Sequence, residues 1–525
     1  MPSSVRREFD LVVLGSGIAG LAAALAAAGE GRSVALVSKE PTLEECNTLY
    51  AQGGIVTAGE GDSAALLARD ITAAGDGINN REAVDLLASE GPALVEELLV
   101  RQLAVPFTRA ADGSVALTRE AAHSVRRILY AKDATGLAIE TALLAAAARH
   151  PGIAAFPAHL AIDLITNTHN STDPQERYRR TRVIGAYVRD QASATVEIFF
   201  APAVVLATGG IGNVFLHTSN PPGATGDGIA MASRIGVEIL NAEYVQFHPT
   251  VLFHRDVKRF LVSEALRGEG ACLVNHRGER FMARYEPERG DLAPRDEVSR
   301  AMYREMEEEG SDYLLLDARA AKGVRLEERF PGIFEKCRSV GLDIRAEPIP
   351  VVPAAHYFCG GVKVGLTGRA SVPGLYAVGE TACTGVHGAN RLASVSLLEG
   401  LFFGHKAGAD AAKSLSPIPG PLLKSIPDWV SPSHAEEFDP VLIQQDMLNI
   451  QSTMWNYAGI IRNRKRLERA LADLDYLSHR IEQFYRQAAV TRSVVELRNA
   501  LLASRVIVSA AYSNRRSLGC HYVEQ

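Results

Sequence analysis

The stretch LVVLGSGIAGLAAALAAAG covers residues 11–29 and contains no charged residue. Its length of nineteen residues suits a membrane-spanning helix, and a basic start before an apolar run is typical of a secretory signal. However, Asp10 stands directly before the run, and Gly15, Gly17 and Gly20 follow the strand-like LVVL in the spacing GxGxxG. This spacing favours a third interpretation, a dinucleotide-binding turn between a strand and a helix.

Each position of this motif requires glycine for a physical reason. The first permits a tight turn, the second lets the backbone approach a pyrophosphate, and the third allows the helix to pack closely on the strand. The segment LAAALAAAG supplies a helix whose N-terminus can bind phosphate, and SVALVSK, residues 33–39, follows as the next parallel strand. Ser38 and Lys39 stand where an acidic ribose-binding residue is expected, so the motif departs from its usual pattern there.

Composition limits the classes of protein that fit. At 525 residues the chain is long enough for two to four domains. Its 55 basic and 61 acidic residues give a net charge of -6, which does not favour binding to a nucleic acid. Six cysteines occur without a CxxC pair, which argues against an iron–sulfur or zinc site and against a disulfide framework. We therefore expect a cytoplasmic protein with no metal and with neither nucleic acid nor membrane as a partner.

Two further strand-like segments also run into glycines. They are VVLATGGIGN, residues 204–213, and GLYAVGE, residues 374–380. Tight turns between strands and helices would explain any one of them. Three glycine-ended strands far apart in the chain instead indicate one parallel sheet whose carboxyl ends share a crevice. In this respect the sequence resembles flavoproteins that bind FAD through a Rossmann-like domain.

A series of shorter motifs narrows the resemblance. In chain order they are NTLYAQGGI (47–55), TGDGIAMA (225–232), QFHPT (246–250), EALRGEGA (264–271), APRDEVSRA (293–301), AHYFCGGV (355–362) and GVHGANRLASVSLLEG (385–400). Together they resemble the succinate dehydrogenase, fumarate reductase and L-aspartate oxidase flavoprotein family over nearly the whole chain. Asn47 stands where the succinate dehydrogenases and membrane-bound fumarate reductases carry the histidine that bonds covalently to FAD. The resemblance therefore points to the L-aspartate oxidase branch, with noncovalent FAD.

The resemblance implies an α/β fold with a Rossmann-like FAD-binding domain, an inserted α+β capping domain and a C-terminal helical bundle domain. Six prolines occur between residues 417 and 440, which excludes a continuous helix there, and beyond them apolar residues recur three and four apart. The expected parts are the first part of the FAD-binding domain at 1–245, the capping domain at 246–355, the second part of the FAD-binding domain at 356–413, a proline-rich linker at 414–440 and the helical domain at 441–525.

The resemblance also implies the residues that bind FAD. They are Gly15, Ser16, Gly17, Ala19, Gly20, Ser38, Lys39, Asn47, Thr48, Ala51, Gln52, Gly53, Gly54, Thr208, Gly209, Gly210, Asp227, Glu380, Ser396 and Leu397. Of these, Glu380 resembles the residue that binds the ribose or ribityl chain. Ser396 and Leu397 are expected to open a helix near the flavin ring, where a helix N-terminus stabilises negative charge. Val395 replaces the asparagine that is common at its position.

The substrate site is implied by the same motifs. Arg295 and Arg391 match the family's two substrate arginines, and we expect both in loops, where each planar guanidinium can bind a carboxylate bidentately. His248 and His356 match the substrate histidines. Gln246 and Ser263 belong to the same motifs, and Ser263 keeps a hydroxyl where the family usually has threonine.

Glu120 resembles the carboxylate that faces the substrate ammonium in L-aspartate oxidases and so distinguishes aspartate from succinate. The alternative for Glu120 is a salt bridge with Arg126 or Arg127 of the same loop. Ala121 and Ala122 follow it where the family commonly has two glycines.

The activity implied is FAD-dependent oxidation of L-aspartate to iminoaspartate, by hydride transfer from Cα to flavin N5. Oxygen or fumarate would accept the electrons, and the product links the enzyme to quinolinate synthase and NAD biosynthesis. Two alternatives stay open: a soluble fumarate reductase or succinate dehydrogenase-type flavoprotein, and an electron-transfer subunit docked to an iron–sulfur partner at a membrane. Asn47 opposes the second.

Overall fold

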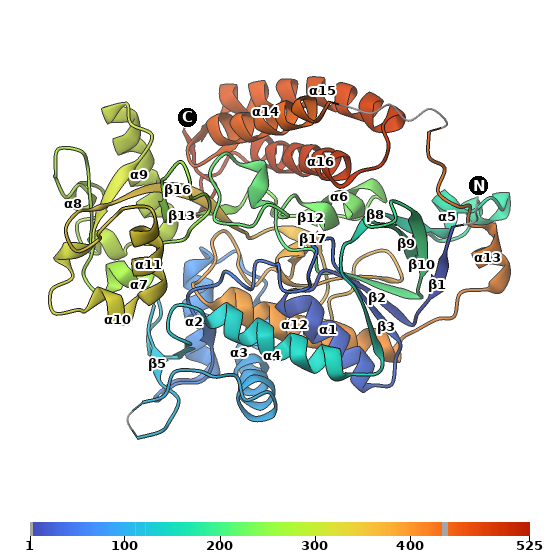
Figure 1. Ribbon diagram of the computed structural model, residues 1–525, viewed down its shortest axis with the longest axis horizontal. Coiled ribbons are helices and arrows are strands. Elements are labelled where there is room, and N and C mark those ends of the chain that lie inside the picture. Colours follow the sequence, from blue (N-terminus) through green and yellow to red (C-terminus); the bar gives the residue numbers. More distant parts are fainter. Residues whose placement is uncertain (1–3, 111, 121, 433–438, 525) are drawn as a thin grey trace.

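The computed structural model describes residues 4–110, 112–120, 122–432 and 439–524. Three groups of elements can be followed in Figure 1. A mixed body of strands and helices lies at the centre and right, a smaller sheet with helices lies at the left, and three long helices from the end of the chain lie along the top. The fold is the predicted α/β architecture with a helical C-terminal region.

A five-stranded parallel sheet forms the centre of the main body. Its strands, in spatial order, are β18 (Leu375–Ala377), β11 (Ala203–Leu206), β2 (Leu11–Leu14), β3 (Val34–Val37) and β7 (Ile153–Phe156). The first four strands are completely buried, which explains their uninterrupted apolar sequences. The three glycine-ended segments of the sequence thus lie side by side in one sheet, as predicted.

The alanine-rich stretch forms helix α1 (Ile18–Gly29), which packs against helix α12 (Val395–Lys413). Every fourth residue of α12 at this contact is glycine. A Cβ at Gly404 would lie 2.4 Å from the carbonyl oxygen of Ala19, and one at Gly408 would lie 2.1 Å from that of Ala23. Small residues on both helices therefore allow backbone-to-backbone packing, which accounts for the apolar run without a membrane.

The remaining strands build smaller sheets. They are β1 (Arg6–Glu8), β8 (His159–Thr166), β9 (Val183–Asp190) and β10 (Val196–Phe200) in one sheet; β4 (Ile55–Val56), β5 (Leu117–Thr118) and β6 (Ile128–Leu129) in another; β12 (Ile239–Leu240), β17 (Gly361–Lys363) and β19 (Ala382–Cys383) in a third; and β20 (Arg462–Asn463) with β21 (Val523–Glu524). The helices of the main body are α2 (Ala64–Ala74), α3 (Arg81–Leu94), continued by a π-helix (Val95–Gln102), α4 (Thr135–Arg149), α5 (Asn167–Asn170) and α6 (Asp227–Arg234).

The part at the left of Figure 1 is a four-stranded antiparallel sheet with helices on it. Its strands are β13 (Val245–Leu252), β14 (Cys272–Val274), β15 (Leu314–Asp317) and β16 (Ile349–Phe358), and its helices are α7 (Glu264–Gly268), α8 (Met282–Tyr285), α9 (Arg295–Glu309), α10 (Leu326–Arg329) and α11 (Pro331–Ser339). The expected boundary at 355/356 falls inside β16, which continues unbroken from this sheet toward the main body. The domain limits therefore remain a prediction.

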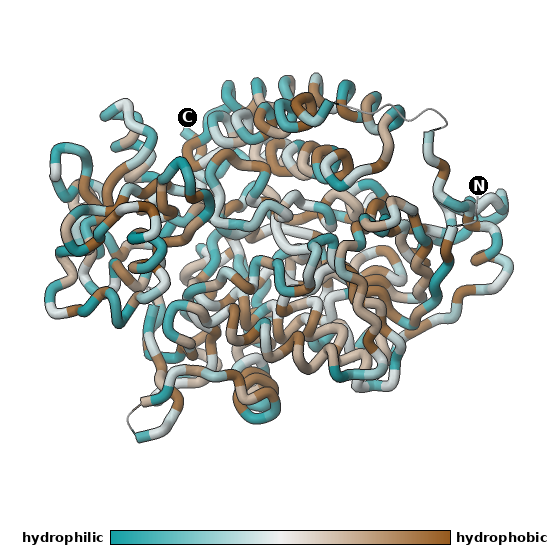
Figure 2. Tube along the Cα trace, viewed as in Figure 1, coloured by the Kyte–Doolittle hydropathy of each residue, from teal (hydrophilic) through white to brown (hydrophobic). Residues whose placement is uncertain are grey.

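Helices α14 (Pro440–Ala458), α15 (Arg464–Gln487) and α16 (Arg492–Ser513) pack on one another above α6 (Figure 1). Hydrophilic residues lie on the outer turns of this layer, and apolar residues lie along its inner side (Figure 2). A short helix, α13 (Gly420–Ser425), lies within the expected linker. Among the described residues, no helix combines the length and the apolar character that a membrane span requires.

One buried carboxyl group leads to a stability prediction. Glu140 of α4 is 1% exposed, and its carboxyl group lies beside the thiol of Cys46. Burial raises the pKa of Glu140 well above its usual value, because the charged form is penalised there. The stabilisation that this group provides is present below its unfolded pKa of about 4.3 and is lost as pH rises, by about 1.4 kcal/mol per pH unit.

We therefore expect Glu140→Gln, which cannot ionise, to remove this slope. Thermal unfolding of the two FAD-loaded proteins between about pH 5 and about pH 8 measures it. The melting temperature of the original protein should fall relative to that of the variant as pH rises. Parallel profiles would contradict the assignment.

Candidate active site

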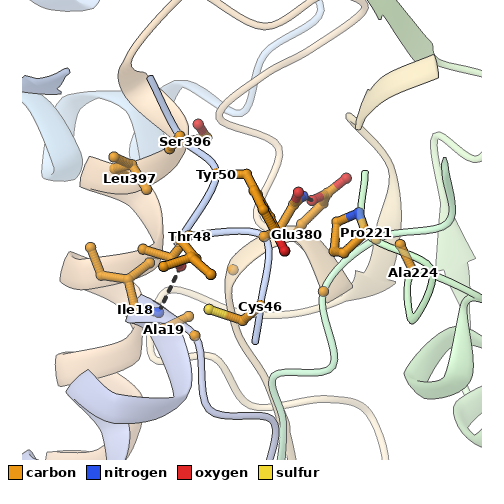
Figure 3. Close-up of a pocket in the computed structure, with 18 of the residues that line it drawn as sticks. Ile18, Ala19, Cys46, Thr48, Tyr50, Pro221, Ala224, Glu380, Ser396 and Leu397 are labelled. Carbon is orange, nitrogen blue, oxygen red and sulfur yellow. Dashed lines mark hydrogen bonds between the residues drawn. The ribbon is translucent and has the colours of Figure 1, made fainter. Parts of the chain in front are cut away.

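A cavity of about 470 Å³ opens at the carboxyl ends of β2, β11 and β18 and extends to the four-stranded antiparallel sheet. Almost all of the site residues predicted from the sequence line it. Gly20 and Gln246 are the two exceptions. Figure 3 shows part of the wall, with Ile18 and Ala19 of α1 on one side and Pro221 and Ala224 on the other.

The glycine turn has a backbone conformation that leaves no room for side chains at Gly15 and Gly20. Gly15 has a φ of 115°, and a Cβ there would lie 2.1 Å from the carbonyl oxygen of Ala207 at the end of β11. Gly20 faces inward instead, where a Cβ would lie 2.0 Å from the carbonyl oxygen of Gly15. Its role is the predicted close packing of α1, so the expected direct FAD contact is corrected.

The N-terminus of α1 faces the cavity. Gly17 precedes the helix without a capping side chain, and the first helical N–H, that of Ile18, donates to Oγ1 of Thr48 over 3.0 Å (Figure 3). Backbone N–H groups at a helix N-terminus, with no side chain at Gly15 and Gly17 to cover them, suit a pyrophosphate. These residues therefore fit the phosphates of FAD.

A half-buried carboxylate lies across the cavity from α1. Glu380 accepts hydrogen bonds from the side-chain amide of Asn47 over 3.1 Å and from the backbone N–H of Phe358 over 2.9 Å. Burial raises the pKa of Glu380 to about 7. A Cβ at Gly210 would lie 2.1 Å from Oε1 of Glu380, so the glycine lets this side chain lie flat against the strand end. Glu380 and Asn47 thus present polar groups suited to sugar hydroxyls.

The third C-terminal helix, α16, contacts two residues of the cavity wall from behind. The ammonium of Lys39 lies 2.6 Å from Asp227 and 2.8 Å from Glu496 of α16. The amide of Asn499, also on α16, donates to Asp227 over 2.9 Å. Lys39 and Asp227 line the cavity as predicted. Their partners lie more than 250 residues away in the sequence, and no local signal identified them.

Two arginines meet at the other end of the cavity. Oε1 of Gln246 accepts a hydrogen bond from Arg295 over 3.2 Å and from Arg391 over 3.0 Å. Gln246 is completely buried behind them, so it holds the two guanidinium groups apart and is not itself exposed to the cavity. Arg295 begins helix α9, which corrects the expectation of a loop, whereas Arg391 lies in a loop before α12.

Arg391 is a buried cation without an acidic partner. It is 5% exposed, its Nε has no hydrogen-bond partner, and no ion pair joins it to a carboxylate of the described residues. Its guanidinium carbon lies 4.6 Å from the centre of the Tyr357 ring, and Nη1 donates to Ser396 over 3.0 Å. Because an isolated buried charge is unfavourable, this group is suited to binding an anionic ligand.

Two neutral histidines lie beside the arginines, with ring centres 5.1 Å apart. Burial, together with the nearby Arg295, holds the pKa of His248 well below its usual value; burial and Arg391 do the same for the pKa of His356. Nδ1 of His248 accepts the backbone N–H of Thr250 over 3.2 Å, which places its proton on Nε2. His248 can therefore donate a hydrogen bond to a ligand near neutral pH.

Glu120 also reaches this end of the cavity. Its Oε2 accepts a hydrogen bond from the hydroxyl of Ser394 over 2.7 Å. No ion pair joins Glu120 to Arg126 or Arg127 among the described residues, and Arg127 pairs with Asp62 and Asp70 instead. Burial raises the pKa of Glu120.

The backbone after Glu120 is strained. Ala122 adopts a φ of 64°, the left-handed conformation that glycine favours, at about 1–2 kcal/mol for an alanine. This explains why the family commonly has glycine there.

Ala121 lies outside the described residues, whereas Val395 is the buried first residue of α12. Ser263 caps α7 through the N–H of Ala265.

The sequence did not single out Glu264, although it touches the arginine site. Its carboxylate lies 2.7 Å from Arg295 and 3.7 Å from the buried Arg267. Burial opposes its ionisation, but Arg295 and Arg267 outweigh this and hold the pKa of Glu264 below its usual value. The order EALRG does signal this pair, because residues three apart on a helix share a face.

The geometry suits a dicarboxylate with an amine. Two guanidinium groups can each bind one carboxylate, and Glu120 presents a carboxyl group to the same cavity. No group of three or more potential metal ligands is found in the part of the chain that the structure describes.

Comparisons with known proteins agree with this geometry. The sequence matches the FAD binding domain family over residues 10–397 and the fumarate reductase flavoprotein C-terminal family over residues 447–525. It is 43% identical to an L-aspartate oxidase of Yersinia pestis, over 99% of this chain and 97% of the relative. It is 42% identical to an L-aspartate oxidase of Pseudomonas aeruginosa, over 98% of this chain and 95% of the relative.

Solved structures resemble the fold over its whole length. An E. coli quinol fumarate reductase subunit superposes with a TM-score of 0.88 at 29% identity, covering 99% of this chain and 92% of that one. Sdh1 of Mycobacterium smegmatis gives a TM-score of 0.81 at 30% identity, covering 99% and 89%.

Proposed function

This chain belongs to the L-aspartate oxidases, within the FAD-binding flavoproteins, and on that premise we propose how its residues oxidise L-aspartate to iminoaspartate. The observation that carries the proposal is the pair of guanidinium groups separated by Gln246, with Glu120 beside them. A four-carbon diacid with one amine has the matching set of charges. FAD, when bound, supplies the acceptor for the hydride that leaves Cα.

The arginines fix the substrate. Arg295 and Arg391 each bind one carboxylate, and the Nε2–H of His248 donates a further hydrogen bond. Held at both ends, the substrate presents its Cα–H to one face only. Positioning of this kind is the main contribution of the protein to the rate. The translational and rotational entropy of the substrate is lost on binding, so it does not add to the barrier of the reaction step.

Glu120 handles the amine. Its Oε2 is engaged by Ser394, so Oε1 faces the ammonium and takes a proton from nitrogen as the C–N double bond forms. A carboxylate with a raised pKa is a better base than an exposed one. The balance is complete: Cα loses a hydride, the ammonium nitrogen loses one proton to Glu120, and the protonated imine remains, which loses its last proton to solvent on release.

The context of the reaction is part of the proposal. Oxygen or fumarate takes the electrons. This oxidation is the first step of de novo NAD biosynthesis, and its imine product feeds a quinolinate synthase. A cytoplasmic location agrees with the six cysteines, all of which are free thiols. We propose the remaining cavity residues for the FAD-binding and substrate-binding roles that the family resemblance implies.

An anaerobic titration of the yellow protein tests the function. L-Aspartate should bleach the flavin absorbance in stoichiometric amount, while succinate should not. Bleaching by succinate alone, with fumarate turnover intact, would favour the soluble fumarate reductase instead. Activity only after addition of an iron–sulfur partner would favour the docked electron-transfer subunit.

A further inference from the structure

Ser394 connects the substrate end of the cavity to its FAD end. Its hydroxyl donates to Oε2 of Glu120 over 2.7 Å and accepts the backbone N–H of Gly54 over 3.1 Å. The residue is 7% exposed and precedes α12 with a φ of 58°, in the left-handed conformation. A non-glycine residue held in this conformation is fixed by its surroundings, which here are the two hydrogen bonds and the start of the helix.

The bond to Ser394 also determines which oxygen of Glu120 is available. Oε1 of Glu120 lies 2.8 Å from where a Cβ of Gly53 would stand, so the missing side chain leaves room for the carboxylate. No hydrogen bond to Oε1 is found within the described ranges, and Glu120 lines the cavity. One oxygen is thus anchored and the other is directed to the ligand.

We propose that Ser394 is a positioning residue that aims Glu120 at the substrate ammonium and thereby sets the preference for amino dicarboxylates over plain dicarboxylates. The inference rests on the proposed function and goes beyond it, because Ser394 itself touches no reacting atom. Without the hydroxyl, Glu120 loses its anchor, and its carboxylate can turn away from the substrate ammonium.

The charges around Glu120 determine the expected pH dependence. Glu264 of α7, Arg295 of α9, and Arg391 in the loop before α12 face it. Burial and then Glu264 raise the pKa of Glu120, whereas Arg295, Ser394 and Arg391 oppose the rise. Loss of the hydroxyl removes one stabiliser of the carboxylate form, so the pKa rises further and the acid limb of aspartate oxidation moves to higher pH.

Ser394→Ala tests the proposal with two substrates. We expect kcat/KM for L-aspartate to fall about ten-fold or more, as for loss of a hydrogen bond to a charged group, and its acid limb to shift upward. Fumarate reduction should stay within about two-fold, because fumarate has no amine. Equal losses for both substrates, or an unmoved acid limb, would overturn the proposal.

Ser394→Gly separates the hydroxyl from the backbone. Glycine relieves the left-handed strain, so it should restore activity if only the conformation matters. We expect it to lose aspartate oxidation as the alanine variant does; recovery would overturn the proposal. Ser124→Ala is the matched control. Ser124 lies in the same loop as Glu120, but its hydroxyl donates to Asp70 of α2 and faces no substrate group. Its ratio of aspartate to fumarate activity should be unchanged, and a shift like that of Ser394→Ala would contradict a specific role.

A double-mutant cycle shows whether Ser394 acts through Glu120. Adding Ser394→Ala to Glu120→Gln should change aspartate oxidation little further. Fully additive losses would overturn the proposal. A wild-type protein that does not oxidise aspartate at all would refute the proposed function instead, so the two failures are distinguishable.

Discussion

Replacing Arg391 with alanine is expected to lower kcat/KM by about 10³-fold for both L-aspartate and fumarate. The guanidinium is buried, its Nε is unpaired, and no carboxylate in the described part of the chain forms an ion pair with it. A substrate carboxylate is the group that would compensate this charge. Removing one member of a buried charge pair costs about 3–5 kcal/mol, because the other member is left uncompensated. Steady-state kinetics with both substrates measure the loss.

Arg391→Lys is the conservative comparison. Lysine keeps the charge but loses the planar fork and the stacking on Tyr357, so we expect an intermediate loss that is mainly in KM. FAD content should be unchanged in both variants, which excludes a general collapse of the cavity. A loss of less than ten-fold in the alanine variant with normal FAD content would remove Arg391 from the proposed clamp.

Glu120→Gln is expected to lower aspartate oxidation by about 10²-fold or more while fumarate reduction changes little. The amide cannot take the ammonium proton, and general-base catalysis contributes about 10²–10⁴-fold. Fumarate has no amine and makes no use of this group. The ratio of the two kcat/KM values is therefore the diagnostic quantity, since it cancels differences in the amount of active enzyme.

A remote carboxylate provides the control for this substitution. Glu197 is 5% exposed and pairs with Arg7 far from the cavity. Glu197→Gln should leave the ratio unchanged even where it lowers stability. Equal loss of both activities in Glu120→Gln would show that Glu120 supports the site structurally and does not select the amine.

Much of the fold follows from local patterns in the sequence. The GxGxxG turn, the buried strands that end in glycine and the C-terminal helical periodicity are all properties of short segments, and the structure contains each of them. The contacts that complete the site are of another kind. Glu496 and Asn499 reach Lys39 and Asp227 only because α16 folds back over α6. Sequence periodicity predicts such a helix but not the surface on which it packs.

The substrate end shows the same limit. The motifs indicated Gln246 as a ligand of the substrate, whereas the structure places it behind the arginines as their spacer. Residue type predicts hydrogen bonding but does not tell which side of a cavity wall a side chain occupies. The sequence does not indicate Ser394 for a similar reason, since its hydrogen-bond partners Glu120 and Gly54 lie in distant segments.

The contact between α1 and α12 has a consequence for the whole reaction. Helix α1 starts at the phosphate-binding turn, and helix α12 starts beside Ser394. The packing of the two helices therefore fixes the distance between the dinucleotide site and the diacid site. This distance is set by backbone-to-backbone contact at Gly404 and Gly408, where no side chain can change its rotamer to compensate. Any larger residue at these points would misalign electron donor and acceptor without touching either.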